Sequence, residues 1–230
     1  MIKEIINKLH SELPATVKLV AVSKFHPFEA IQEAYEAGQR IFAESRPQEL
    51  IAKVRRLEEI RAERGDSGFM VDIQWHFIGH LQTNKLKMVL PYVSLVQSVD
   101  SVRLLDAIQN WAEVNCRMIA VLLEPHVAAE ETKQGFSADE IYEILSAADR
   151  YPNISFKGIL GMATFTDDES VIRSDFAHLR EIFDKCRSEF PHLASYFAEF
   201  SIGMSDDYSL AIEYGSTMVR IGSLIFGMRS

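Results

Sequence analysis

Residues 17–39, VKLVAVSKFHPFEAIQEAYEAGQ, contain the pattern that decides the fold. Residues 17–22 are apolar apart from Lys18, and so short an apolar run predicts a strand buried on both faces. Residues 27–38 follow a helical pattern that has proline at its start and glycine at its stop. A buried strand followed directly by a helix is one βα unit, from which parallel sheets are built.

The same unit recurs along the chain. Apolar runs occur at residues 17–23, 41–44, 72–79, 93–99, 117–125, 154–162, 196–203 and 217–227, each followed by a helix or a short helical turn. Such alternation predicts parallel strands with crossover helices, and this number of units in 230 residues fits a single α/β (β/α)8 TIM-type barrel. A doubly wound open sheet is the alternative.

Two further features complete the predicted architecture. Residues 1–14 are amphipathic and predict an extra N-terminal helix, and Asp100 is expected to cap the helix over residues 100–115. No linker, low-complexity tract or shift in composition interrupts the sequence. We therefore expect residues 1–230 to form a single domain.

The composition narrows the class of protein. The 24 basic residues against 33 acidic ones give a net charge of −9, which argues against binding to the phosphate backbone of nucleic acids. The two cysteines, Cys116 and Cys186, lack metal-ligand spacing and are typical of core thiols in a reducing compartment. No secretory signal is present, and no apolar run approaches the ~20 residues that span a bilayer. We expect a cytoplasmic protein with no metal site and no nucleic-acid or membrane partner.

Barrels carry their functional residues at the C-terminal ends of the strands. In this sequence the ends are Ser23, Lys24, Glu44, Ser45, His76, Phe77, Ser98, Glu124, Gly161, Met162 and residues 201–205 and 220–223. Lys24 is a candidate reactive group, because a lysine partly removed from water has a lowered pKa and can form a Schiff base. On spacing alone, a lysine that extends its ammonium into solvent is the alternative interpretation.

Residues 200–209, FSIGMSDDYS, are the first candidate anion site. Ser201 and Ser205 supply hydroxyl groups, Gly203 allows close approach of backbone, and the following helix start supplies unpaired N–H groups. A plain turn in which Asp206 or Asp207 caps the helix explains the same residues.

Residues 215–227, GSTMVRIGSLIFG, are the second candidate anion site. Arg220 lies inside an apolar strand, and the period-2 alternation puts it on the same face as Met218 and Gly222. A buried guanidinium needs a carboxylate or a ligand as its partner. Gly222 and Ser223 add further donors, and barrels often bind phosphate in the loops after the last two strands. A reactive lysine and a phosphate site together fit pyridoxal 5′-phosphate.

Several motifs also resemble a known family. LVAVSKFHPFEAIQEAYEAGQRIFAE, IQWHFIGHLQTNKLK, ETKQGF, KGILGMAT and SIGMSDDYSLAIEYGSTMVRIGSLIFG together resemble the pyridoxal-phosphate homeostasis proteins, also called the proline-synthase co-transcribed protein family. The resemblance extends over about residues 17–227. It implies the barrel of the alanine-racemase N-terminal domain, with Lys24 as the lysine that binds pyridoxal phosphate. It also implies that Ser201, Ser205, Gly222 and Ser223 hold the phosphate and that Arg220 faces the pyridine nitrogen.

The sequence departs from the family pattern at two positions. Ser45 stands where the family usually has an asparagine that contacts the cofactor, and His80 stands where it often has proline. His76 is a further candidate cofactor contact, and a hydrogen-bonded structural role is its alternative. An always-charged arginine near the ring nitrogen disfavours protonation of that nitrogen, so carbanion chemistry is less stabilised.

The resemblance favours a carrier over an enzyme. We expect no catalytic residue, and a monomer that stores, buffers or delivers pyridoxal phosphate to apoenzymes. A racemase of the alanine-racemase type is the main alternative, but it needs a second base, a tyrosine from a further domain that we do not expect here. An aldolase with Glu44 as acid/base and a regulatory module that uses the cofactor as a signal are further alternatives.

Overall fold

The computed structural model describes residues 1–127 and 135–227, so residues 131–134 of the ETKQGF motif lie outside the described part. The strands are β1 (Lys18–Val22), β2 (Ile41–Glu44), β3 (Gln74–Phe77), β4 (Leu95–Val99), β5 (Ile119–Leu123), β6 (Ile154–Leu160), β7 (Glu199–Ser201) and β8 (Met218–Ile221). The helices are α1 (Ile2–Glu12), α2 (Phe28–Glu36), α3 (Pro47–Arg64), α4 (Leu86–Val89), α5 (Val102–Val114), α6 (Ala138–Ser146), α7 (Glu169–Glu189), α8 (Tyr208–Glu213) and α9 (Ser223–Phe226). Two 3₁₀ turns are Thr83–Lys85 and Ala148–Arg150.

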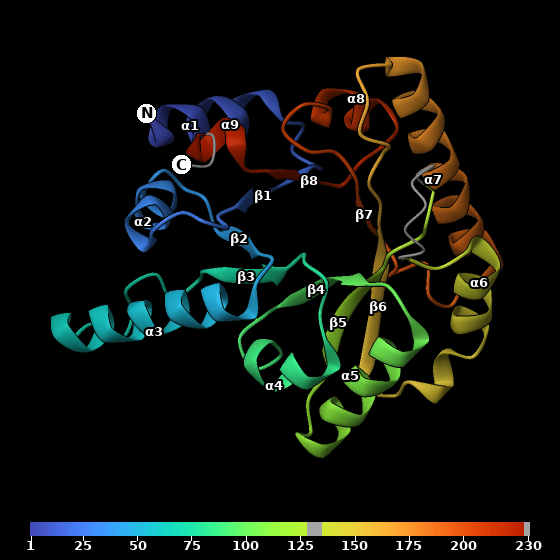
Figure 1. The fold of residues 1–230 in the computed structure, drawn as a ribbon, viewed down its shortest axis with the longest axis horizontal. Helices are drawn as coiled ribbons and strands as arrows, with labels where there is room; N and C mark the ends of the chain where they lie inside the picture. The colour runs from blue at the N-terminus through green and yellow to red at the C-terminus, as the bar shows by residue number, and fades with distance from the viewer. Residues whose placement is uncertain (128–134, 228–230) are drawn as a thin grey trace.

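The strands form a closed parallel barrel. Neighbouring strands pair in chain order, and β1 also pairs with β8, which closes the sheet. The helices lie around the outside of the strands (Figure 1). The predicted (β/α)8 barrel with an N-terminal helix is therefore confirmed, and the open sheet is excluded. No described helix is both long enough and apolar enough to cross a bilayer.

Apolar side chains fill two layers, because successive residues of a strand point to opposite faces. The inner layer fills the barrel and consists of Val20, Val22, Ala43, Leu95, Leu122, Leu160 and Met218. The outer layer lies between strands and helices and contains large fully buried residues such as Phe42, Phe77 and Phe200. A few buried polar side chains, among them His76, Gln97, Ser201 and Arg220, interrupt these apolar layers.

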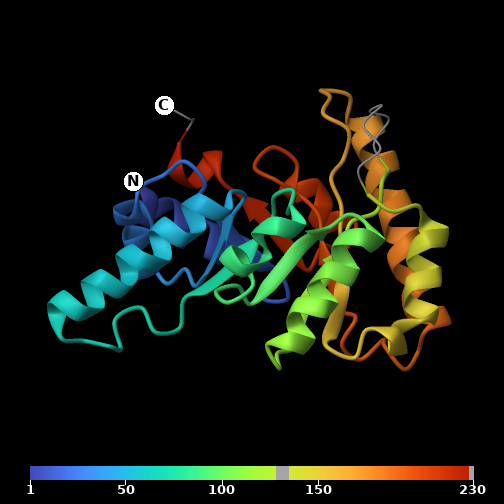
Figure 2. The same ribbon diagram turned by 60° about the horizontal axis from the view of Figure 1, so that its bottom comes forward.

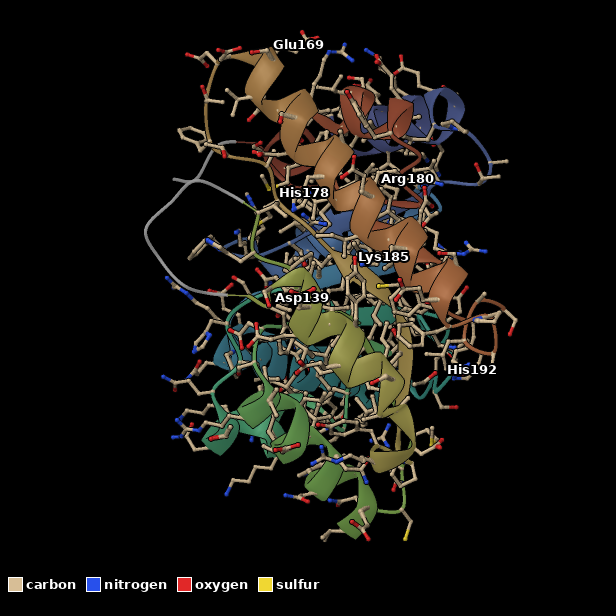
Figure 3. The ribbon with its side chains drawn as sticks, turned by 90° about the vertical axis from the view of Figure 1, so that its right-hand side faces the viewer. Asp139, Glu169, His178, Arg180, Lys185 and His192 are labelled. Carbon is tan, nitrogen blue, oxygen red and sulfur yellow. The ribbon has the colours of Figure 1, made fainter. Side chains whose placement is uncertain are left out.

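α6 and α7 cover the β5–β7 side of the barrel and lie side by side (Figure 3). α6 begins with a capping box, in which Ser137 accepts from the Glu140 backbone and the Glu140 carboxylate accepts in return. The Lys185 ammonium of α7 lies 4.1 Å from the centre of the Tyr142 ring of α6. These contacts fix the helices without involving the strand ends.

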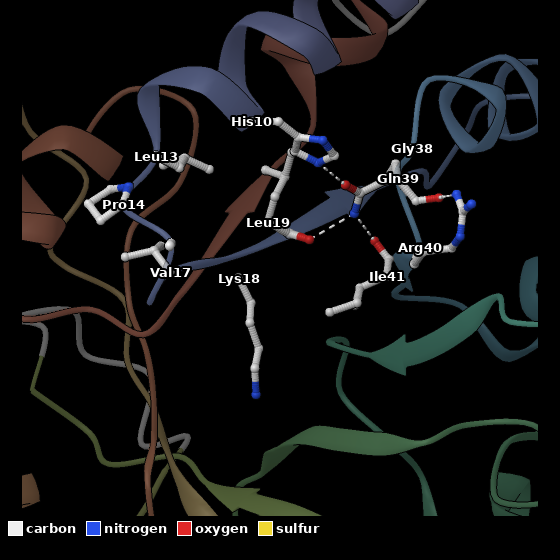
Figure 4. Close-up of a pocket in the computed structure, with 11 residues that line it drawn as sticks. His10, Leu13, Pro14, Val17, Lys18, Leu19, Gly38, Gln39, Arg40 and Ile41 are labelled. Carbon is white, nitrogen blue, oxygen red and sulfur yellow. Dashed lines mark hydrogen bonds between the residues drawn. The ribbon is translucent and has the colours of Figure 1, made fainter.

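α1 lies on the outside of the barrel next to α2 and α9, and Gln39 joins it to the strands. The Gln39 amide donates to the carbonyls of Leu19 (2.7 Å) and Ile41 (2.6 Å), and its oxygen is 3.0 Å from His10 Nε2 (Figure 4). This buried amide joins α1 to β1 and β2 beside a cavity of about 250 Å³. α1 also lies next to α9 in both ribbon views (Figures 1 and 2).

The expected cap of α5 is corrected by one residue. Ser101 is the N-cap, because its hydroxyl accepts from the Leu104 backbone N–H at 3.3 Å. Asp100 instead accepts from His80 Nδ1 at 2.9 Å and from the Ser101 hydroxyl at 3.0 Å. The prediction was wrong because a serine in the next position competes for the same orphan N–H groups.

A substitution at Gly158 tests how far the close pairing of β6 with β7 stabilises the closed barrel. Its φ is +150°, and an added Cβ would lie 1.7 Å from the Glu199 carbonyl oxygen, so alanine forces β6 away from β7. We expect Gly158→Ala to lower the free energy of unfolding in urea by about 3 kcal/mol or more. The control is Gly65→Ala, which has φ +63° and no neighbour within 4 Å and should cost only ~1 kcal/mol. Equal losses in the two variants would contradict this account.

Candidate functional site

Closure of the barrel brings Lys24 beside the loop that follows β8. Ala21 of β1 is in register with Ile221 of β8. Gly222 lies next to Val22, because a Cβ on Gly222 would be 3.1 Å from the Val22 carbonyl oxygen. Lys24 follows Val22 by two residues and is half-buried. The reactive-lysine candidate and the second anion-site candidate therefore leave neighbouring strands at the same rim.

The first anion-site candidate joins the second one through Ser205. The Gly222 N–H donates to the Ser205 hydroxyl at 3.3 Å, and exposed Ser223 begins α9 directly after Gly222. Asp207 accepts from the Met204 N–H at 2.5 Å and makes no side-chain cap on α8. Ser205, Gly222 and Ser223 thus come together next to Lys24.

Ser45 borders Lys24 on the other side. Ala43 of β2 is in register with Val22, so half-buried Ser45 follows β2 where Lys24 follows β1. A Cβ on Gly79 would lie 2.1 Å from the Ser45 carbonyl oxygen, so only glycine fits at position 79. The sequence analysis missed this role of Gly79.

Arg220 lies inside the barrel directly below this rim. Its guanidinium donates to the Ser201 carbonyl and hydroxyl, both at 2.7 Å, and to the Gly161 carbonyl at 2.9 Å. Burial lowers the pKa of Arg220 to about 10, while the charges of Glu124 and Asp207 act in the opposite direction. The side chain is therefore a buried cation at neutral pH.

Ser201 supports Arg220 from within the barrel. Its side chain is fully buried, donates to Gln97 Oε1 at 2.8 Å and accepts from Arg220. The structure therefore places Ser201 beneath the rim, apart from Ser205, Gly222 and Ser223. Gln97 was missed by the sequence analysis, although an amide within the apolar run 93–99 was the signal that could have revealed it.

His76 lies toward the opposite mouth of the barrel. It lines a cavity of about 390 Å³ together with residues at or near strand starts, including Lys18 and Glu199, which form an ion pair. Its Nδ1 is 2.8 Å from Gln97 Nε2. Burial, with a smaller contribution from Lys18, lowers the pKa of His76 to about 3. The ring is thus neutral and hydrogen-bonded inside the barrel.

Glu44, the acid/base required by the aldolase alternative, does not face the rim. Its carboxylate is fully buried and accepts from the Ser23 hydroxyl at 2.6 Å and from the Lys53 ammonium of α3. It therefore lies between β2 and α3, outside the barrel wall. This position takes Glu44 away from the acid/base role that the aldolase alternative assigns to it.

Glu124 is the strand-end carboxyl group with the most perturbed ionisation. Burial, followed by the charge of Asp100, raises the pKa of Glu124 to about 7, although Arg220 and His80 oppose the shift. Glu124 directly follows β5, and its backbone N–H donates to the Val99 carbonyl at 2.9 Å. The rim thus contains one carboxyl group that titrates near neutral pH.

The raised pKa of Glu124 predicts that the free energy of unfolding depends on pH. Because its pKa is raised from 4.5 to about 7 in the folded chain, folding retains a proton that the unfolded chain releases in that window. The free energy of unfolding should therefore fall as pH rises between these values. Glu124→Gln should lack this fall and be more stable than wild type above pH 7 by on the order of 2 kcal/mol. Glu58→Gln, at an exposed position of α3, is the control. If the free energy of unfolding, measured in urea at each pH, changes with pH in the same way for wild type and Glu124→Gln, the assignment is contradicted.

Comparison with known proteins identifies the family. The family described as "Alanine racemase, N-terminal domain" matches residues 1–230. The pyridoxal phosphate homeostasis protein of Aquifex aeolicus is 37% identical over 216 residues, which cover 92% of this chain and 87% of the relative. The protein of the same name from Escherichia coli K12 is 33% identical over 217 residues, covering 94% of this chain and 87% of the relative.

Solved structures agree with the sequence relatives. PipY of Synechococcus elongatus PCC7942, solved with PLP bound, has a TM-score of 0.86 and 32% identity, covering 99% of this chain and 100% of PipY. The alanine racemase of E. faecalis has a TM-score of 0.67 at 18% identity, covers 57% of that longer chain and shows the fold alone. The chain therefore belongs to the alanine racemase N-terminal domain family and, within it, to the pyridoxal phosphate homeostasis proteins.

Proposed function

We propose that this chain binds pyridoxal phosphate at the rim formed by β1, β2, β7 and β8, with Lys24 as the attachment point. The observation that carries the proposal is the placement of Lys24 beside the Ser205, Gly222 and Ser223 cluster on neighbouring strand ends. The names of the relatives and the PLP complex of PipY support the choice of ligand.

Attachment requires only one condensation step. The Lys24 amine adds to the aldehyde carbon, the aldehyde oxygen leaves as water, and a carbon–nitrogen double bond forms. The Ser205 and Ser223 hydroxyls and the Gly222 backbone would hold the phosphate, while Ser45 borders the ring. Arg220 would place a positive charge near the pyridine nitrogen and keep it unprotonated, which disfavours carbanion chemistry. Ser201 and His76 would act indirectly, through Arg220 and Gln97.

The proposed role is to buffer the cofactor and deliver it to apoenzymes, with the protein acting as a monomer. Racemisation would need a second base, which is a tyrosine in the racemase alternative. Tyr214 does not serve as one, because it packs outside the barrel with its ring 6.1 Å from that of Phe176 on α7. The test is a racemisation assay with alanine on the loaded protein. Turnover that disappears in Lys24→Ala would overturn the carrier role and establish the racemase.

Lys24 is tested by covalent trapping. Wild type incubated with pyridoxal phosphate should absorb at about 420 nm, and borohydride should fix the cofactor mass on the peptide that contains Lys24. Lys24→Ala should lose both signals. Lys18→Ala, at the other end of β1, is the matched control and should keep them. An unchanged band in Lys24→Ala would remove Lys24 from this role.

Ser205 is tested with a ligand that cannot condense with an amine. Pyridoxamine 5′-phosphate carries the ring and the phosphate without the aldehyde, so its affinity reports the non-covalent contacts without attachment to Lys24. Ser205→Ala should weaken its binding about 10- to 100-fold, the equivalent of one hydrogen bond to a charged group. Ser209→Ala, at an exposed position of α8, is the control, and calorimetry measures both. Equal affinities in the two variants would place the phosphate elsewhere.

A further inference from the structure

The turn that carries Lys24 has an unusual backbone conformation. Phe25 has φ +68°, a left-handed value that is costly for an aromatic residue. Its N–H donates to Glu49 Oε2 at 2.8 Å, and the Arg46 guanidinium lies 4.5 Å from the centre of its ring. Arg46 precedes α3 and Glu49 lies in its first turn. Contacts from one helix therefore hold a turn that the isolated chain would avoid.

A buried ion pair lies beneath the same turn. The Lys53 ammonium of α3 donates to the Ser23 carbonyl at 2.7 Å and to Glu44, which also accepts from the Ser23 hydroxyl. The side chains of Lys53 and Glu44 are 8% and 0% exposed. The pair therefore holds both the carbonyl and the hydroxyl of Ser23, the residue that immediately precedes Lys24.

This pair is poorly explained by stability alone. Removing two charges from water is expensive, and apolar side chains of similar volume often stabilise a protein as well or better. Glu44 Oε2 is buried without a hydrogen-bond partner among the described residues, and burial raises the pKa of Glu44 although Lys53 opposes the shift. What the pair does provide is a fixed position for the Ser23 carbonyl.

We propose that Lys53, held by Glu44, is the positioning residue for Lys24. By fixing Ser23 while the other contacts of α3 fix Phe25, it sets the direction in which the Lys24 side chain leaves β1. The amine then meets a ligand whose phosphate lies in the Ser205, Gly222 and Ser223 cluster. Lys53 itself touches no ligand. This proposal rests on the proposed function, because it assumes that Lys24 is the attachment point.

The test compares two ligands that share the phosphate and the ring. Pyridoxal 5′-phosphate needs a correctly placed amine, whereas pyridoxamine 5′-phosphate does not. In Lys53→Met the dissociation constant of pyridoxal 5′-phosphate should rise about 10- to 100-fold, as expected when a reacting group is displaced. The dissociation constant of pyridoxamine 5′-phosphate should change less than about threefold. The matched control is Lys185→Met on α7, which should change neither constant.

Two further variants keep the proposal falsifiable if Lys53→Met folds poorly. Glu44→Gln/Lys53→Met replaces the ion pair with neutral side chains of similar shape and should show the same selective loss. Lys53→Arg keeps a cationic donor and should recover part of the aldehyde affinity. A parallel loss for both ligands, or no loss for either, in the variants that fold would overturn the positioning role. If wild type binds both ligands equally and borohydride traps no mass on Lys24, the proposed function itself fails.

Discussion

The pairing of β1 with β8 is the constraint on which the candidate site depends. In an open sheet of eight strands, neighbours ~4.8 Å apart would separate the first and last strands by about 34 Å. Closure instead puts Val20 in register with Arg220 and brings Lys24 beside Gly222. Residues at opposite ends of the sequence thereby share one rim, close enough for a single small molecule to contact both.

Closure also turns polar side chains inward, where their hydrogen bonds must be satisfied. Arg220, Ser201, Gln97 and His76 meet this demand as one continuous chain across the interior. The guanidinium donates hydrogen bonds to two carbonyl groups and one hydroxyl, which are neutral acceptors and do not cancel its charge. Among the described residues, the charges of Glu124 and Asp207 oppose the lowering of its pKa. The interior below the rim therefore contains a buried positive charge, which suits an anionic ligand above it.

The architecture could be predicted from the sequence because each βα unit has its own local pattern, and all eight predicted strands are present in the barrel. The details of the site were harder to predict from the sequence. Period-2 alternation gives the face of Ser201 and His76 but not their height in the barrel, so both were assigned to the rim although they lie below it. Lys53 lies on the buried face of α3 between Leu50 and Leu57. From the sequence alone, a charged residue at such a position is predicted to be solvent-exposed unless its partner is known. Glu44 is that partner, and only the packing of α3 on β2 brings the two together.

In the proposed site, two independent parts of the fold determine where the Lys24 amine lies. The β1–β8 pairing sets the position of the strand end relative to Ser205, Gly222 and Ser223. α3 sets the direction of the turn through contacts with Ser23 and Phe25. In the proposed site α3 supplies no ligand contact of its own, so substitutions on α3 can alter the geometry of attachment without changing the groups that bind the phosphate. The proposed carrier role, in which the ligand is held and later released, would use such separate control, because binding strength and attachment chemistry then vary independently.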